Sequence, residues 1–174
     1  MSARRGLCLA VLALAVLVAG CAASRAARLR EEADRTVAGF SASVPELEAH
    51  LAQAPAWAVF PRVGLDPSSP RDEGLLCRPG EEPLPCTLVR PLAGEPPAGV
   101  VYHEMVLLTA EDLAVLLAEG SLDLPDSAEV YDWAGAWLDE PSAAPATSGT
   151  RRITTPRSGL LFAEPVHGQR LELR

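Results

Sequence analysis

Residues 99–108 read GVVYHEMVLL, and this run restricts the fold more than any other part of the chain. In an extended strand, successive side chains point to opposite faces of the sheet. One face would carry Val101, Met105 and Leu107, and the other would carry Val100, Tyr102, Val106 and Leu108. A strand with two apolar faces is typical of the centre of a sheet, although a buried helix segment gives the same pattern.

Helix signals lie on both sides of this run. Thr109 is placed to cap a helix that Gly120 ends, with Asp112 at the third helical position. Apolar spacings of three and four predict three further helices. They are expected at residues 26–40, between a capping box at 43–46 and Pro55, and from Asp126 to Pro141.

Five further short strands are expected from apolar and β-branched runs bounded by turn residues. They are Trp57–Val63, Thr87–Leu92, Arg152–Thr155, Gly159–Ala163 and Arg170–Leu173. Residues 64–85 are rich in Pro, Gly and charge and are expected to form a loop. Together these patterns predict an α+β fold, a small mixed domain with about four helices and a short, mainly antiparallel sheet.

The N-terminal segment has the order of a secretory signal. Arg4 and Arg5 precede an unbroken apolar run over residues 7–18, and small residues follow it. An uncleaved membrane anchor is the alternative, because residues 6–24 carry no charged side chain and just reach the length of a spanning helix. Either interpretation predicts that the rest of the chain lies outside the inner membrane.

The sequence Val18-Ala19-Gly20-Cys21 resembles the lipobox of bacterial lipoproteins. The resemblance implies cleavage between Gly20 and Cys21 and acylation of the Cys21 sulfur, with palmitate or a similar chain. Because Ala22 rather than Asp follows the cysteine, it also implies the outer membrane of a Gram-negative envelope, with the domain facing the periplasm. Two or more acyl chains would anchor the protein stably.

The predicted organisation has three parts. Residues 1–20 would be the signal peptide, residues 21–25 the lipidated cysteine and a short tether, and residues 26–174 a single α+β domain with a loop at 141–150. The 174-residue chain has a formal net charge of -8, and removing residues 1–20 with their two arginines makes it -10. This acidic balance argues against nucleic acid as a partner.

The four cysteines have different expected fates. Cys8 leaves with the signal peptide and Cys21 is lipidated, so only Cys77 and Cys86 remain in the domain. In an exported protein an even pair predicts a disulfide, here closing a short loop rich in turn residues. A zinc site is not expected, because no histidine lies near the pair at ligand spacing.

Few residues suggest chemistry. His103 and Glu104 are adjacent in the predicted central strand and would point to opposite faces, so His103 is expected to be a partly buried strand residue or, alternatively, a binding residue. Trp133 and Trp137 are four apart and would form either the core face of a helix or an aromatic platform for a glycan or a protein. No catalytic residue, metal site or cofactor is predicted, since no phosphate loop, nucleophile elbow or His-Glu-x-x-His motif occurs.

Arg151, Arg152 and Arg157 form a local basic cluster. We expect it to lie on a solvated turn, with contact to phosphate headgroups or to an acidic partner as the alternative.

Two functions of different class remain after these exclusions. The first is a membrane-anchored envelope lipoprotein that serves as a non-catalytic accessory or binding subunit of another envelope component, with the membrane and an envelope protein as partners. The second is a lipid-anchored enzyme or small-ligand binder that uses the His103/Glu104 or the Trp133/Trp137 region. The second function requires a pocket at one of these regions.

Overall fold

The computed structural model describes residues 2–44, 46–64, 68–90, 101–125, 129–131, 137–139, 149–158 and 168–174. Within these ranges, side chains are described from residue 23 onward, except at 129–131, 137–139 and 156–158. The described helices are α1 (Ser2–Ser43), α2 (Leu47–Gln53) and α3 (Ala110–Glu119). The described strands are β1 (Ala56–Val63), β2 (Arg71–Cys77), β3 (Leu84–Val89), β4 (Val101–Leu108), β5 (Ser121–Asp123), β6 (Glu129–Tyr131), β7 (Trp137–Asp139), β8 (Arg151–Ser158) and β9 (Arg170–Leu173).

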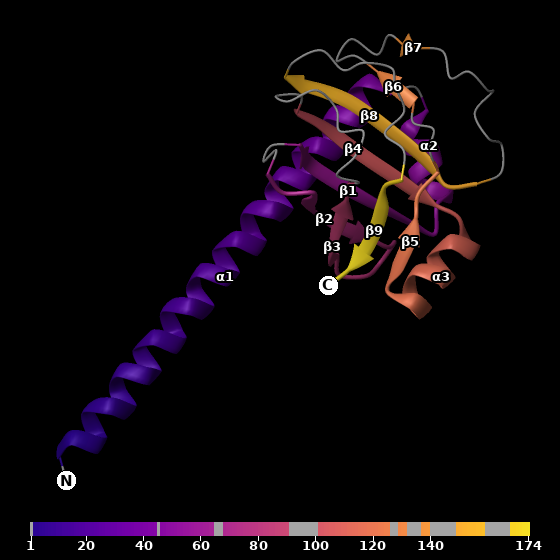
Figure 1. Ribbon diagram of the computed structural model, residues 1–174. Helices are drawn as coiled ribbons and strands as arrows, with labels where there is room; N and C mark the ends of the chain where they lie inside the picture. Colours follow the sequence, from indigo (N-terminus) through magenta and orange to yellow (C-terminus); the bar gives the residue numbers. More distant parts are fainter. Residues whose placement is uncertain are drawn as a thin grey trace.

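The described strands form one curled sheet in the order β5-β9-β3-β2-β1-β4-β8-β6-β7. The seven strands from β5 to β8 in this order pair antiparallel and curl into a half-barrel, as Figure 1 shows. β6 joins the far edge of β8 in parallel, and β7 pairs antiparallel with β6. The predicted α+β class, with about four helices and a short sheet, is therefore wrong: the described chain has three helices and is mostly sheet.

The run at residues 99–108 forms the central strand β4 between β1 and β8, as its two apolar faces predict. On one face, which we call the helix face, Met105 and Leu107 pack with Phe40 of α1 and Leu47 of α2. On the other, which we call the inner face, Tyr102, Val106 and Leu108 pack with Phe60 and with Leu116 of α3. Helices α1 and α2 thus cover one side of the sheet and α3 the other (Figure 1).

Helix α1 is longer than the predicted helix at residues 26–40. It is continuous from Ser2 to Ser43, so residues 21–25, expected to be a short tether, are helical. Among the described side chains of α1, the first apolar one that packs against the sheet is Leu29, which joins a cluster with Ala33, Val59 and Leu75. The N-terminal part of α1 projects away from the sheet in Figure 1.

The local signals around the helices succeed in one place and fail in another. Thr109 accepts a hydrogen bond from the Asp112 backbone N–H, and Gly120 ends α3 with φ 75°, so both predicted ends of α3 are confirmed. The predicted capping box at residues 43–46 is wrong. Ser43 ends α1, and Glu46, the residue before α2, adopts a left-handed conformation (φ 58°) without a side-chain cap, so it is not the third residue of a helix as a capping box requires.

The expected fourth helix is also wrong in its described parts. Residues 129–131 and 137–139 are the strands β6 and β7. Val130 and Tyr131 favour strands, and Gly135 weakens a helix that would have to run through it. The edge of β8 supplies hydrogen-bond partners for these residues, and β6 pairs with it in parallel.

Strands β2 and β5 were not expected. β2 lies within residues 64–85, which the sequence marks as a loop, yet it pairs with both β1 and β3. The expected strand Gly159–Ala163 lies outside the described residues, as do residues 141–148 of the expected loop. The C-terminal strand Arg170–Leu173 is confirmed as β9.

Candidate functional site

The structure separates His103 from Glu104. Their backbones are adjacent in β4, so their side chains point to opposite faces, and His103 shares the helix face with Met105. Glu104 points to the inner face, where its side chain is fully buried. The two residues therefore do not form one site, in agreement with the expectation from alternation.

Glu104 pairs with Arg152, a residue that the sequence places on a solvated turn. The Arg152 Nε atom donates to Glu104 Oε1 at 2.8 Å, and the two side chains are 1% and 0% exposed. The register of β4 and β8 explains the contact, because Val106 lies opposite Arg152 and Glu104 lies opposite Thr154. Neighbouring inner-face positions on adjacent strands thus bring the two charges together.

Further polar groups complete the surroundings of Arg152. Its Nη1 atom donates to the Pro125 carbonyl at 2.6 Å, and its Nη2 atom donates to Gln169 Oε1. Gln169 Nε2 in turn donates to the Tyr102 hydroxyl at 3.0 Å. Burial, and after it the charge of Glu104, raises the pKa of Tyr102 far above its usual range, so the phenol stays protonated. We call these four residues, Tyr102, Glu104, Arg152 and Gln169, the inner-face network.

A second buried ion pair lies on the same face. Arg90 Nε donates to Asp72 Oδ2 at 2.7 Å, with side-chain exposures of 3% and 6%. The Gly64 backbone N–H also donates to Asp72 Oδ1, at 3.1 Å, and Arg90 Nη2 donates to the Ser69 carbonyl at 2.7 Å. Each guanidinium is therefore bound both to a carboxylate and to backbone oxygens of a neighbouring segment.

Both ion pairs connect segments that are distant in the sequence. Arg152 joins β4, the end of β5 and the start of β9, and Arg90 joins the two ends of the β2–β3 hairpin. Each carboxylate is held by a guanidinium, and no group of three His, Cys, Asp or Glu residues in the described chain is placed to hold a metal ion. Of the four carboxylate oxygens in the two ion pairs, only Glu104 Oε2 has no hydrogen-bond partner among the described residues. The geometry therefore favours a structural role, in which the two ion pairs hold distant segments of the curled sheet together, over acid–base chemistry.

The structure does not bring Cys77 and Cys86 together, and both are free thiols. Cys86 lies opposite Gly74 in the β2–β3 pair, three residues along β2 from Cys77. An odd offset places the two side chains on opposite faces of the sheet: Cys86 belongs to the inner-face core and Cys77 packs on the cluster of Leu75. The expected disulfide would need a change of register.

The surroundings of both thiols disfavour the reactive thiolate. Burial, and after it the charge of Asp34, raises the pKa of Cys77 to about 11. Burial raises the pKa of Cys86 even further above its usual range. At neutral pH both sulfurs are protonated, and a protonated thiol is a poor nucleophile and metal ligand.

The described side chains do not test the expected roles of Trp133 and Trp137 as a helix core face or an aromatic platform. Trp133 lies outside the described residues, and Trp137 begins β7 with its side chain outside them. A surface hollow in the described part of the chain lies between α3 and β5. It is lined by Val115, Glu119, Ser121, Leu122, Asp123 and Arg170, and none of the predicted site residues borders it.

Comparison with known proteins provides no family for this chain. No protein-family model matches the sequence, and no curated protein is significantly similar to it. Among the residues that the structure describes, none of the helices combines the length and the apolar character needed to cross a membrane.

Proposed function

We propose that this chain is a lipid-anchored lipoprotein of the bacterial envelope, and that its domain is a non-catalytic accessory or binding subunit of another envelope component. The observation that carries the proposal is the lipobox-like sequence Val18-Ala19-Gly20-Cys21 at the end of an apolar signal segment. Its place in an outer membrane, with the domain facing the periplasm, follows from Ala22 and is part of the same proposal.

The course of α1 supports an anchoring role. Cys21 and Leu29 lie in the same helix, so about 12 Å of helical rise separates the proposed lipid from the first residue packed on the sheet. A helix holds its direction over this distance, whereas an extended tether does not. The lipid would therefore position the domain close to the membrane surface and in one orientation.

Ion pairs add to the apolar contacts between α1 and the sheet. Arg25 donates twice to Glu73 of β2, at 2.7 and 3.1 Å, and Arg30 pairs with Glu82. Burial alone would raise the pKa of Glu73, but hydrogen bonds from Arg174 and Arg25 outweigh it and lower that pKa. The Glu73 carboxylate is thus charged at neutral pH and holds α1 against β2.

The non-catalytic part of the proposal rests on the inner-face network. The charges of Glu104 and Arg152, and those of the second buried pair, Asp72 and Arg90, are matched by each other and by backbone groups of neighbouring segments. The separation of His103 from Glu104 weighs against one of the two regions that the alternative enzyme or ligand-binding function would use; the side chains of the other, Trp133 and Trp137, lie outside the described residues.

Photo-cross-linking in intact membranes tests the accessory role. Leu117 of α3 is 45% exposed and is the one large apolar side chain exposed in the described part of the chain, which makes it a suitable position for a photoreactive residue. Amine-reactive reagents do not suit this protein, because its sequence contains no lysine. We expect irradiation to give one reproducible cross-linked protein.

The exposed Glu111, on another side of the same helix, is the matched control position. A product formed from position 117 and absent from position 111 would support a defined interface. Only uncross-linked monomer at both positions would contradict the accessory role.

A further inference from the structure

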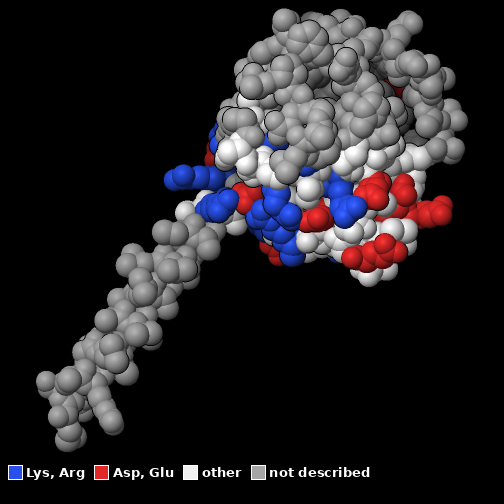
Figure 2. All heavy atoms as spheres, viewed as in Figure 1, with Lys and Arg blue, Asp and Glu red and all other residues white. Residues whose placement is uncertain are grey.

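The charges along α1 are segregated. The first three ionisable residues after Cys21 are Arg25, Arg28 and Arg30, and acidic residues begin only at Glu31. This order is unexpected in a chain that carries more acidic than basic residues. Figure 2 shows basic side chains gathered where α1 meets the domain and acidic ones over the distant α3 and β5.

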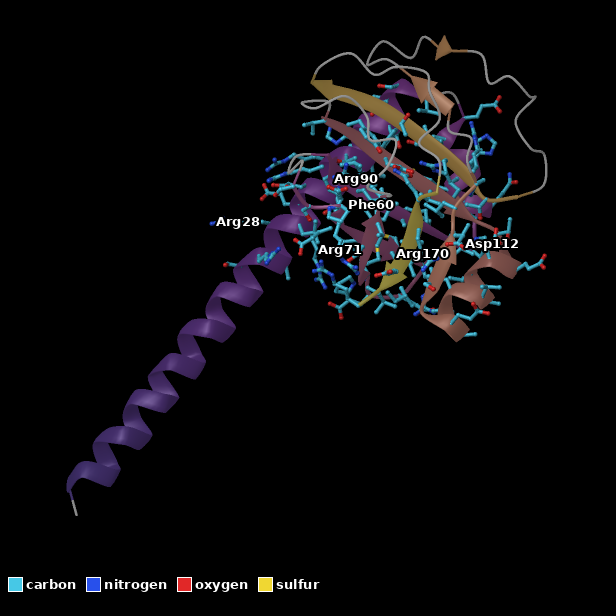
Figure 3. All side chains as sticks on the ribbon, in the orientation of Figure 1. Arg28, Phe60, Arg71, Arg90, Asp112 and Arg170 are labelled. Atoms are coloured by element: carbon cyan, nitrogen blue, oxygen red, sulfur yellow. The ribbon has the colours of Figure 1, made fainter. Side chains whose placement is uncertain are left out.

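Arg28 is the member of this group that none of the described carboxylates neutralises. Arg25 pairs with Glu73 and Arg30 with Glu82, whereas Arg28 is exposed and has no ion pair in the part of the chain whose side chains are described. Its side chain extends from the side of α1 that faces away from the sheet (Figure 3). A positive charge is therefore available for a partner outside the molecule.

The acidic residues that follow do not cancel this charge. Glu31 pairs with Arg35, and Glu32 pairs with Arg62 of β1. Asp34 lies thirteen residues beyond Cys21, which is about 20 Å of helical rise. Positive charge thus dominates the first two turns of α1 after Cys21.

Helical geometry places these arginines at the height of lipid headgroups. If Cys21 is the acylated residue, Arg25 lies about 6 Å and Arg28 about 10 Å above it along α1. The polar layer of one leaflet is roughly 5–8 Å thick, and the field of anionic lipids extends a further ~8 Å, one Debye length at physiological salt. A tilt of the helix would bring both side chains closer still.

We propose that Arg28 binds the anionic phosphate groups of the lipid surface that holds the chain. The interaction gives the domain a second contact with its own membrane, next to the acyl chains. It fixes the rotation of α1 about its own axis as well as the distance of the domain from the membrane. This inference rests on the proposed lipid anchor.

Chemical modification of arginine tests the proposal on the full acylated protein. The protein is extracted from membranes and reconstituted into vesicles of phosphatidylcholine alone or with added phosphatidylglycerol. Phenylglyoxal then modifies exposed arginines, and mass spectrometry of peptides gives the rate at each position. Arg35 is an internal control, because it lies seven residues after Arg28, on the same side of α1 and about 10 Å further from Cys21.

We expect phosphatidylglycerol to slow the modification of Arg28 about fivefold, which corresponds to the ~1 kcal/mol that one basic side chain gains at an anionic surface. The rate should recover in high salt, and Arg35 should change little. An Arg28 rate that is the same in both vesicles would overturn the proposal. So would slowing in both vesicles that salt does not reverse, because that result indicates steric cover rather than phosphate binding.

The same samples separate this inference from the proposed function. A protein that carries no acyl chains and sediments with neither type of vesicle would contradict the lipid anchor, and the headgroup contact with it. A protein that sediments with both vesicles while Arg28 reacts equally in each would leave the anchor intact and contradict only the headgroup contact.

Discussion

Replacing Arg152 with methionine should destabilise the domain by about 3–5 kcal/mol, because it leaves the fully buried Glu104 without its countercharge. The same change removes the donors to Gln169 and to the Pro125 carbonyl. Single domains are stable by only ~5–15 kcal/mol, so the loss would be a large share of the total. Urea denaturation, monitored by circular dichroism, measures this change in the free energy of unfolding.

Two further variants make this prediction specific. The double variant Glu104→Leu with Arg152→Met should recover much of the loss, because an apolar pair of similar volume avoids the buried unpaired charge. Arg170→Met is the surface control: Arg170 also pairs with an acid, Asp123, but both side chains are exposed, so little change is expected. Equal effects of Arg152→Met and Arg170→Met would show that the inner-face network does not support the fold.

Gly74→Ala should cost about 3 kcal/mol, the upper part of the usual range for overpacking a core. A Cβ atom at this position would lie 2.4 Å from Phe60 Cδ1 and 2.6 Å from the Val59 carbonyl oxygen. Phe60 is 0% exposed and lies in the inner-face core, so its ring has no solvent to move into. The Val59 carbonyl oxygen belongs to the sheet, so it cannot move away without a cost in free energy either.

Gly80→Ala is the matched control for this substitution. Gly80 lies in the turn after β2 with φ 77°, and an added Cβ would meet nothing within 4 Å. Its cost is confined to backbone strain of ~1 kcal/mol. Thermal and urea unfolding of both variants should rank Gly74→Ala as clearly worse, and the reverse order would contradict the packing of Phe60 over β2.

The sequence predicts the parts of this fold that depend on local chemistry. The two apolar faces of residues 99–108 predict a central strand, and the Thr109 cap with Gly120 predicts both ends of α3. Strand β2 could not be predicted in this way, because it begins with Arg71-Asp72-Glu73-Gly74, which alone favours a loop. Its pairing is stabilised by tertiary contacts: Asp72 meets Arg90, and Phe60 packs over Gly74.

The inner-face network shows the same limit for the site. Glu104 interrupts an apolar run, and this is a visible signal of a buried partner. Its partner Arg152 is 48 residues away and lies beside another arginine, which suggests a solvated turn until the register of β8 is known. Cys77 and Cys86 show another limit of the sequence. A disulfide was expected because exported proteins oxidise paired cysteines, but this expectation ignores the strand register, which places the two side chains on opposite faces of the sheet.

The intact mass of the wild-type protein extracted from membranes tests the lipid anchor most directly. We expect a chain that begins at Cys21 and carries acyl chains. The Cys21→Ser variant should lose the acyl mass and retain residues 1–20, whereas Cys8→Ser, a change at the other cysteine of the segment, should leave the mature mass unchanged. A wild-type protein that keeps residues 1–20 without any acyl mass would contradict the lipid anchor and favour an uncleaved membrane anchor.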